Sequence, residues 1–222
     1  NESYSNLFNN CIKSKTVCLG SFKNNSIKKK KIKKNKSILF VPSGYEEENK
    51  FYHRSFYKPD TLLLKNLYIY CEKNNLKLEI AGKYYHENKE LNFYRKILKN
   101  ENFKYHFNDK QRNIYSLSDR MLATICSHST FGLESLARGN RTALFNNKSK
   151  IMNGSFNIFW YLKISKRGSF WSNTSDRKEI MRVLNFVIFS KENTWRKKTA
   201  KIIGDLMHFD SGNNKLKKVL NL

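Results

Sequence analysis

The sequence has few acidic residues and no long apolar run. Its 222 residues include 18 Asp and Glu against 43 Lys and Arg, which gives a formal net charge of +25. No segment approaches the roughly twenty consecutive apolar residues of a membrane-spanning helix, and no signal peptide is visible. The charge favours anionic partners, which are phosphorylated substrates, acidic lipid headgroups or nucleic acid. The charge alone does not choose between these three classes.

Cysteine is scarce, and its placement argues against two structural uses. The chain has Cys11, Cys18, Cys71 and Cys126, with no C-x-x-C pair, and the last two lie inside apolar runs. This pattern favours reduced thiols in a cytosolic protein over a disulfide framework or a zinc site. Helix-turn-helix, RRM and zinc-finger signatures are also missing, and the basic residues are spread along the chain, which disfavours nucleic acid as the partner.

The densest positive charge lies between Lys28 and Lys36. Like charges at this density repel one another, so we expect a mobile surface loop or linker here. Two alternatives stay open, a patch that binds an anionic membrane and a patch that binds nucleic acid.

Short apolar strands alternate with helices along most of the chain. Strands are expected at 38–41, 76–82, 103–107, 121–126 and 142–145, with a further brief candidate at 16–20, and helices at 60–73, 87–99, 114–119 and 130–138. Strands that are apolar on both faces predict an α/β fold with a parallel, doubly wound, Rossmann-like sheet covered by helices. Apolar stripes at 180–188 and 195–206 predict two C-terminal helices that pack back onto it.

The turn that follows the strand at 121–126 is predicted to bind phosphate. Free backbone N–H groups at a helix N-terminus, with a dipole equivalent to about half a positive charge, attract anions. We assign the hydroxyls of Ser129 and Thr130 and the N–H groups of Phe131 and Gly132 to a diphosphate, with Gly132 leaving room for close approach. Glu134, one turn into the helix, is predicted to accept hydrogen bonds from a ribose. A plain N-cap and a solvent-facing carboxylate are the alternatives.

Two other turns are expected at the same edge, because the carboxyl ends of parallel strands meet there. Ser43 and Gly44 follow one strand and Lys83 follows another, so all three are candidate phosphate contacts, with a solvated lysine as the alternative at Lys83. His128 is a candidate phosphate contact or acid, or else a turn residue with a local hydrogen bond.

Three further residues have weaker assignments. Tyr115 borders the base pocket or belongs to the core, and Arg138 and Arg141 are interpreted as surface or packing residues, because the helix places them away from its N-terminus.

The segment from Ser129 to Thr142, followed by Phe145, resembles the donor-site segment of surface-carbohydrate biosynthesis proteins similar to GT-B glycosyltransferases. That group includes polysaccharide and glycerophosphate transferases of the same architecture. The likeness extends over roughly 16–200, and its specific part is 113–145. The resemblance implies two Rossmann-like halves that face a cleft, of which this chain is the C-terminal half that holds a nucleotide-sugar donor.

The resemblance also implies what lies outside the chain. The acceptor site and the catalytic base would belong to the other half, and the start at Asn1 rather than Met agrees with a piece of a longer protein. The sequence has no G-x-G-x-x-G signature and no Asp-x-Asp motif, as in the family, so we expect no metal and no cofactor. We divide the chain into an N-terminal segment with the Lys-rich loop (1–36), a Rossmann-like nucleotide-sugar-binding domain (37–175) and C-terminal helices (176–222).

The leading hypothesis is a glycosyltransferase-like protein of surface polysaccharide biosynthesis that binds the diphosphate of a nucleotide sugar at a helix N-terminus. The alternatives are a glycerophosphotransferase or UDP-sugar epimerase of the same fold and, from a different class, a basic nucleic-acid-binding or non-catalytic interaction domain. The expected partners are the nucleotide sugar, a carbohydrate or lipid-linked acceptor and, peripherally, an anionic membrane. The expected location is the cytoplasm or the inner membrane face.

Overall fold

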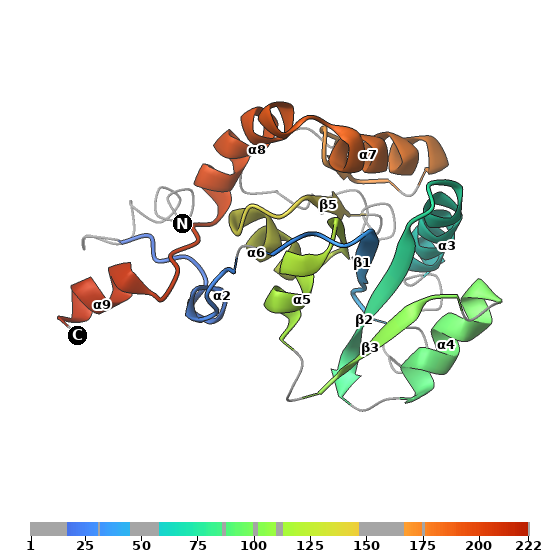
Figure 1. Cartoon of the computed structure of the whole chain (residues 1–222), viewed down its shortest axis with the longest axis horizontal. Helices are drawn as coiled ribbons and strands as arrows, with labels where there is room; N and C mark the ends of the chain where they lie inside the picture. The colour runs from blue at the N-terminus through green and yellow to red at the C-terminus, as the bar shows by residue number, and fades with distance from the viewer. Residues whose placement is uncertain are drawn as a thin grey trace.

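The computed structural model describes residues 17–30, 32–44, 58–85, 88–99, 102–109, 113–146, 167–174 and 176–221. Within these ranges the chain forms one six-stranded sheet in the order β3-β2-β1-β4-β5-β6, in which every pair of neighbouring strands is parallel (Figure 1). The strands are β1 (Ser37–Val41), β2 (Lys77–Tyr85), β3 (Lys104–Asn108), β4 (Ala123–Ser127), β5 (Thr142–Phe145) and β6 (Trp171–Ser172). The expected α/β, Rossmann-like fold is confirmed.

Helices connect and cover the strands. They are α2 (Phe22–Ser26), α3 (Lys58–Lys73), α4 (Asn88–Leu98), α5 (Ile114–Arg120), α6 (Phe131–Ala137), α7 (Arg177–Phe189), α8 (Glu192–Leu206) and α9 (Asn214–Leu220). The chain moves one way along the sheet through α3 and α4 and the opposite way through α6. Right-handed crossovers therefore place these helices on opposite faces. Every residue of β1 and β4 is buried, as a sheet covered on both faces requires.

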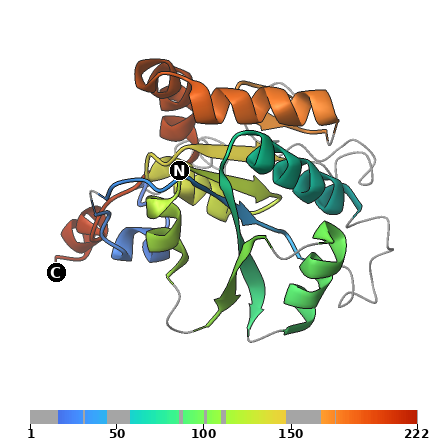
Figure 2. The same ribbon diagram turned by 45° about the vertical axis from the view of Figure 1, so that its right-hand side comes forward.

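The two expected C-terminal helices are present, and they pack on the Rossmann-like unit in different places. α7 lies beside α3 and contacts β5 and β6, and α8 lies against α6 (Figure 2). The predicted apolar stripe of α7 is buried, namely Ile180, Val183, Leu184, Val187 and Ile188. On α8 the buried positions include Trp195 and Thr199. None of the helices in the described ranges combines the length and apolar character that a bilayer span requires.

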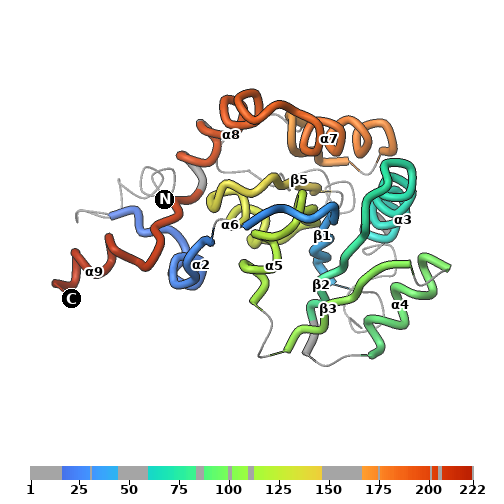
Figure 3. Tube along the Cα trace, viewed as in Figure 1, coloured from blue at the N-terminus to red at the C-terminus, as the bar shows by residue number. Residues whose placement is uncertain are grey.

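The N-terminal segment differs from the expectation at two points. Residues 17–20 form no strand. Gly20, at a φ of +77°, packs closely on the His208 backbone, and a Cβ there would lie 2.2 Å from the His208 carbonyl oxygen. The chain then forms α2, which the sequence pattern did not predict, capped by Ser21 through its hydrogen bond from the Asn24 N–H. The trace of this segment lies beside the segment that leads into α9 (Figure 3).

The described part of the Lys-rich segment contacts the Rossmann-like unit, whereas a mobile loop or linker was expected. The Lys29 amine donates to the Arg138 carbonyl at the end of α6, where the helix dipole favours a cation. The Lys34 amine donates to Asn140 Oδ1 at 3.2 Å, and the Asn35 N–H donates to the Arg120 carbonyl at 2.9 Å. A charge pattern alone does not reveal these contacts.

Candidate functional site

A cavity of about 280 Å³ opens at the carboxyl ends of β1, β2 and β4. Its wall contains Ser43 after β1, Lys83 near the end of β2, and Ser129 after β4, so residues from the three expected strand ends meet at one place. The turn predicted at Lys83 is wrong, because β2 continues to Tyr85. β1 and β4 are neighbours although the chain passes through β2 and β3 between them. In doubly wound sheets, ligands bind where the strand order reverses in this way.

The backbone N–H groups at the N-terminus of α6 differ in whether they already have an acceptor. The Phe131 N–H donates to Ser129 Oγ at 3.3 Å and the Gly132 N–H to the Ser129 carbonyl at 3.1 Å, so both are used within the turn. Among the described residues, no acceptor takes the N–H of Ser129 or Thr130, and both residues line the cavity. The Thr130 side chain makes no cap hydrogen bond. The amides open to an anion are thus two residues earlier than the pair assigned from the sequence.

Packing, which the sequence did not suggest, explains why glycine occupies position 132. It is buried and does not line the cavity. A Cβ there would lie 2.3 Å from Leu144 Cδ2 and 3.0 Å from the Cys126 Cβ. The close approach that this glycine permits is between helix α6 and the sheet, not between the helix and a ligand.

Glu134 faces the cavity with its carboxylate already oriented. It accepts hydrogen bonds from Ser21 Oγ at 2.5 Å and from the Tyr115 hydroxyl at 3.0 Å. Burial, followed by the nearby Glu134 carboxylate, raises the pKa of Tyr115, so the phenol stays a donor at neutral pH. A carboxylate has about four lone-pair sites, so two remain for a ligand. Tyr115 also packs on Phe131, with ring centroids 5.5 Å apart, and lines the cavity.

Two lysines supply positive charge from different elements. Lys83 lines the cavity, with its amine donating to the Ser43 carbonyl and its N–H donating to Glu90 Oε2 at 2.9 Å. Lys23 lines the cavity from α2. The sequence reasoning missed Lys23, because no strand ends near it and only the folded chain brings α2 to this edge.

Asp60, at the start of α3, holds two strand ends together. It accepts hydrogen bonds from Ser43 Oγ at 2.5 Å and from Ser127 Oγ. Gly44 lines a second, smaller cavity with Asp60 and does not line the main one, so it has no direct place in the site. His128 lines the main cavity, and its backbone has a φ of +48°, a left-handed conformation that often occurs at ligand sites in residues other than glycine.

Arg138 is buried and fastens α2 to α6. Its Nε donates to Asp119 Oδ1 at 3.0 Å and its Nη2 to Asp119 Oδ2 at 2.5 Å. Its Nη1 donates to the carbonyls of Asn24 at 3.2 Å and Ile27 at 2.9 Å. Arg141 instead binds the last carbonyls of α7 through Val187 and Ser190. Both arginines are packing residues, as interpreted from the sequence.

The described cysteines are free thiols. Cys18, Cys71 and Cys126 form no disulfide, while Cys11 lies outside the described residues. Burial raises the pKa of Cys71 to about 12 and raises that of Cys126 as well, so neither thiol is reactive at neutral pH. In the described ranges no cluster of His, Cys, Asp or Glu could hold a metal ion.

Lys34 gives a prediction about pH. Burial of its amine, and then the charge of Lys29, lowers its pKa from 10.5 to about 8. The folded chain therefore binds fewer protons than the unfolded chain between pH 8 and 10.5, so this group makes folding more favourable as the pH rises through that window. Competitive acetylation at a series of pH values should show Lys34 half-deprotonated near pH 8. A Lys34 titration unchanged by unfolding in urea would contradict this.

Comparison with known proteins places the chain in a family. The chain is similar to a solved structure described as "S. aureus MnaA-UDP co-structure", with 10% sequence identity and a TM-score of 0.47. The match covers 86% of this chain and 46% of that one, so the chain spans about half the length of that protein. A search of curated proteins finds no match. A family model described as "putative O-antigen biosynthesis protein" matches residues 1–222, and the chain therefore belongs to this family of surface carbohydrate biosynthesis.

Proposed function

We propose that the chain binds the nucleotide-sugar donor of a glycosyltransferase of surface polysaccharide biosynthesis. One observation carries this proposal: residues from the carboxyl ends of three strands meet at one cavity that has positive groups on two sides. The N–H groups of Ser129 and Thr130 lie on one side, and the amines of Lys23 and Lys83 come from α2 and β2. A diphosphate is the ligand that such a set of donors suits best.

The same donors would assist glycosyl transfer. When the bond between the sugar carbon and the diphosphate oxygen breaks, negative charge grows on the leaving diphosphate. Fixed N–H groups and ammonium groups stabilise that charge, and each donor contributes on the order of a few kcal/mol. Ser43 and Ser127, tied through Asp60, keep the ends of β1 and β4 in register, so the donors are positioned before the ligand arrives.

Glu134 completes the proposed donor site as an acceptor for ribose hydroxyls. Ser21 and Tyr115 fix its carboxylate, so little side-chain entropy is lost on binding. His128 remains the catalytic candidate in this chain. The acceptor, a carbohydrate or a lipid-linked saccharide, and the catalytic base are assigned to a part of the protein beyond this chain.

Calorimetry tests this proposal. We expect the purified chain to bind a sugar linked to UDP, GDP or CMP, with an affinity that changes little between about 0.1 M and about 0.3 M salt, since few charges are neutralised. Lys23→Ala should weaken that binding by about tenfold, as expected for a charge-assisted contact, whereas Lys89→Ala, on the exposed face of α4, should not. Absence of heat with all three nucleotide classes would refute the proposal. A steep loss of binding with salt would favour a nucleic-acid ligand instead.

A further inference from the structure

Helix α9 buries none of its own residues against the described part of the chain. Its sequence places Leu216, Val219 and Leu220 at i, i+3 and i+4, so they share one side of the helix. Val219 is 53% and Leu220 is 55% exposed. A helix this short is marginally stable in water unless one apolar side is packed. The exposed apolar side of α9 is therefore a candidate binding surface.

The neighbouring segment continues this surface. The Asn213 side chain donates to the Phe22 carbonyl at 3.1 Å, and the Gly212 N–H donates to the Asn25 carbonyl at 2.7 Å, so α9 begins beside α2. Phe22 is 66% exposed, although it is aromatic. Of the large apolar side chains that are exposed in the described ranges, Val17, Phe22 and Ile32 belong to the N-terminal segment, and Val219 and Leu220 belong to α9.

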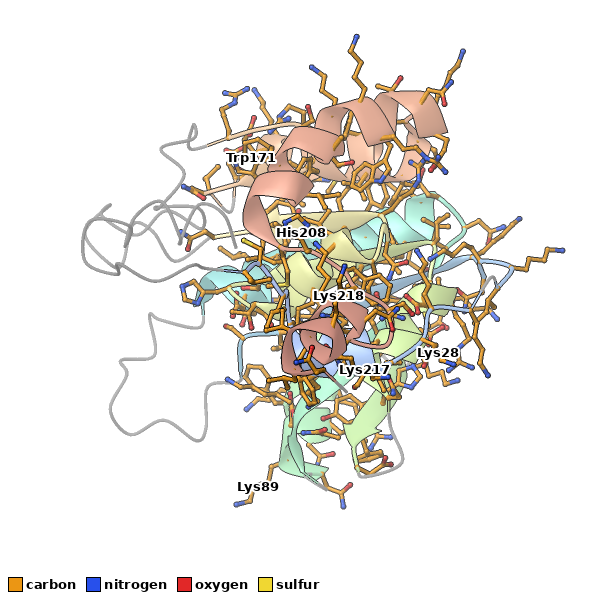
Figure 4. All side chains as sticks on the ribbon, turned by 90° about the vertical axis from the view of Figure 1, so that its left-hand side faces the viewer. Lys28, Lys89, Trp171, His208, Lys217 and Lys218 are labelled. Carbon is orange, nitrogen blue, oxygen red and sulfur yellow. The ribbon has the colours of Figure 1, made fainter. Side chains whose placement is uncertain are left out.

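Exposed lysines accompany these apolar side chains along the same two segments. Lys215, Lys217 and Lys218 lie on α9, and Lys28 and Lys30 lie on the adjoining segment, all of them exposed. Figure 4 looks onto this side of the molecule, with Lys217 and Lys218 on α9 near the viewer and Lys28 labelled on the same side of the view. α9 itself contains no acidic residue. Apolar side chains accompanied by lysines are typical of helices that lie in a bilayer interface.

We propose that this surface, which comprises α9 with the exposed residues of 17–30 and 32–36 and is here named the basic–apolar face, docks on an anionic membrane. The lysines would meet acidic headgroups, while Leu216, Val219, Leu220 and Phe22 enter the boundary between headgroups and acyl chains. A bilayer suits this face better than a protein partner, because it offers negative charge and apolar depth together over the whole area.

The basic–apolar face borders the candidate donor site. Phe22 belongs to the face, and the next residue, Lys23, lines the cavity. Docking would therefore hold the cavity close to the bilayer, where a lipid-linked acceptor lies. The docking proposal does not depend on the nucleotide site.

Sedimentation with sucrose-loaded vesicles tests the proposal. We expect the chain to bind vesicles of phosphatidylcholine with about 30% phosphatidylglycerol, to bind pure phosphatidylcholine at least about tenfold more weakly, and to lose much of the binding at about 0.5 M salt. Val219→Ser with Leu220→Ser should reduce the partition by about tenfold or more, as should Lys217→Glu with Lys218→Glu.

Matched controls lie elsewhere on the surface. Phe189→Ser, at the exposed end of α7, and Lys89→Glu, on α4, should leave vesicle binding unchanged. All four variants should bind the nucleotide as the parent chain does, which separates this proposal from the donor site. Vesicle binding that is unaffected by the α9 variants would overturn the proposal. So would a dimer that the apolar variant dissociates, or binding to single-stranded RNA with none to vesicles.

Discussion

Replacing Arg138 by Met should lower the free energy of unfolding by about 3–5 kcal/mol, which is the cost of leaving one member of a buried ion pair without its partner. The Arg138 guanidinium is fully buried, and it pairs with both oxygens of the Asp119 carboxylate, of which only 2% is exposed. Met fills much of the same volume, so the loss comes mainly from the orphaned charge and from the released carbonyls of Asn24 and Ile27. Urea titration followed by circular dichroism measures it.

Two further variants distinguish loss of the ion pair from other causes of destabilisation. Asp119→Asn added to Arg138→Met removes the orphaned charge and keeps an oxygen for the Asn140 amide, which now donates to Asp119 at 2.8 Å. The double variant should be more stable than the sum of the two single effects predicts. Arg196→Met breaks an exposed ion pair with Glu192 and should cost less than about 0.5 kcal/mol. Equal losses in Arg138→Met and Arg196→Met would contradict the assigned role of the pair.

Arg138 also connects stability to the candidate site. It holds the backbone of α2 at Asn24, and α2 carries Lys23 into the cavity wall. The Arg138→Met variant should therefore bind nucleotide more weakly even under conditions in which it stays folded.

The strands and helices of the sheet were predictable, because their signals are local. The continuous apolar run at Ile38–Val41 indicates a strand covered on both faces, and the stripe from Ile180 to Ile188 indicates a helix with one buried side. The convergence of residues near three strand ends followed from topology, since parallel strands end at one edge. The alternation of strands and helices along the chain was therefore enough to group Ser43, Lys83 and Ser129.

Other features depend on contacts between distant parts of the chain, which the sequence pattern does not encode. Ser21 and Lys23 reach the site because contacts from distant residues, among them Arg138, hold α2 at this edge, and the sequence pattern assigned neither residue to the ligand. The sequence predicted that Gly132 leaves room for a ligand, but the space beside its Cα is filled by Leu144. The sequence predicted a mobile loop for the Lys-rich run, but Lys29 donates to a carbonyl at the C-terminal end of α6.

Glu134 carries the second large prediction, and it concerns affinity. If its carboxylate accepts from the ribose, the chain should bind its preferred nucleoside diphosphate about 10–100-fold more tightly than the 2′-deoxy form, in line with about 1.5–3 kcal/mol for a hydrogen bond to a charged group. Glu134→Ala should weaken binding of the ribose form by a similar factor and bind the two forms about equally. Calorimetry with the four combinations of protein and ligand gives the coupling directly.

The variant must be distinguished from a loss of structure, since Glu134 also accepts from Ser21 and Tyr115. Ser21→Ala loosens the same carboxylate without removing it, so it should lower affinity for both nucleotides while part of the preference for ribose remains. Discrimination between ribose and deoxyribose is a readout that a purely structural role would not change. If Glu134→Ala weakened both forms by the same factor, the carboxylate would serve only to hold α2 against α6, and the ribose would have to be bound elsewhere in the cavity.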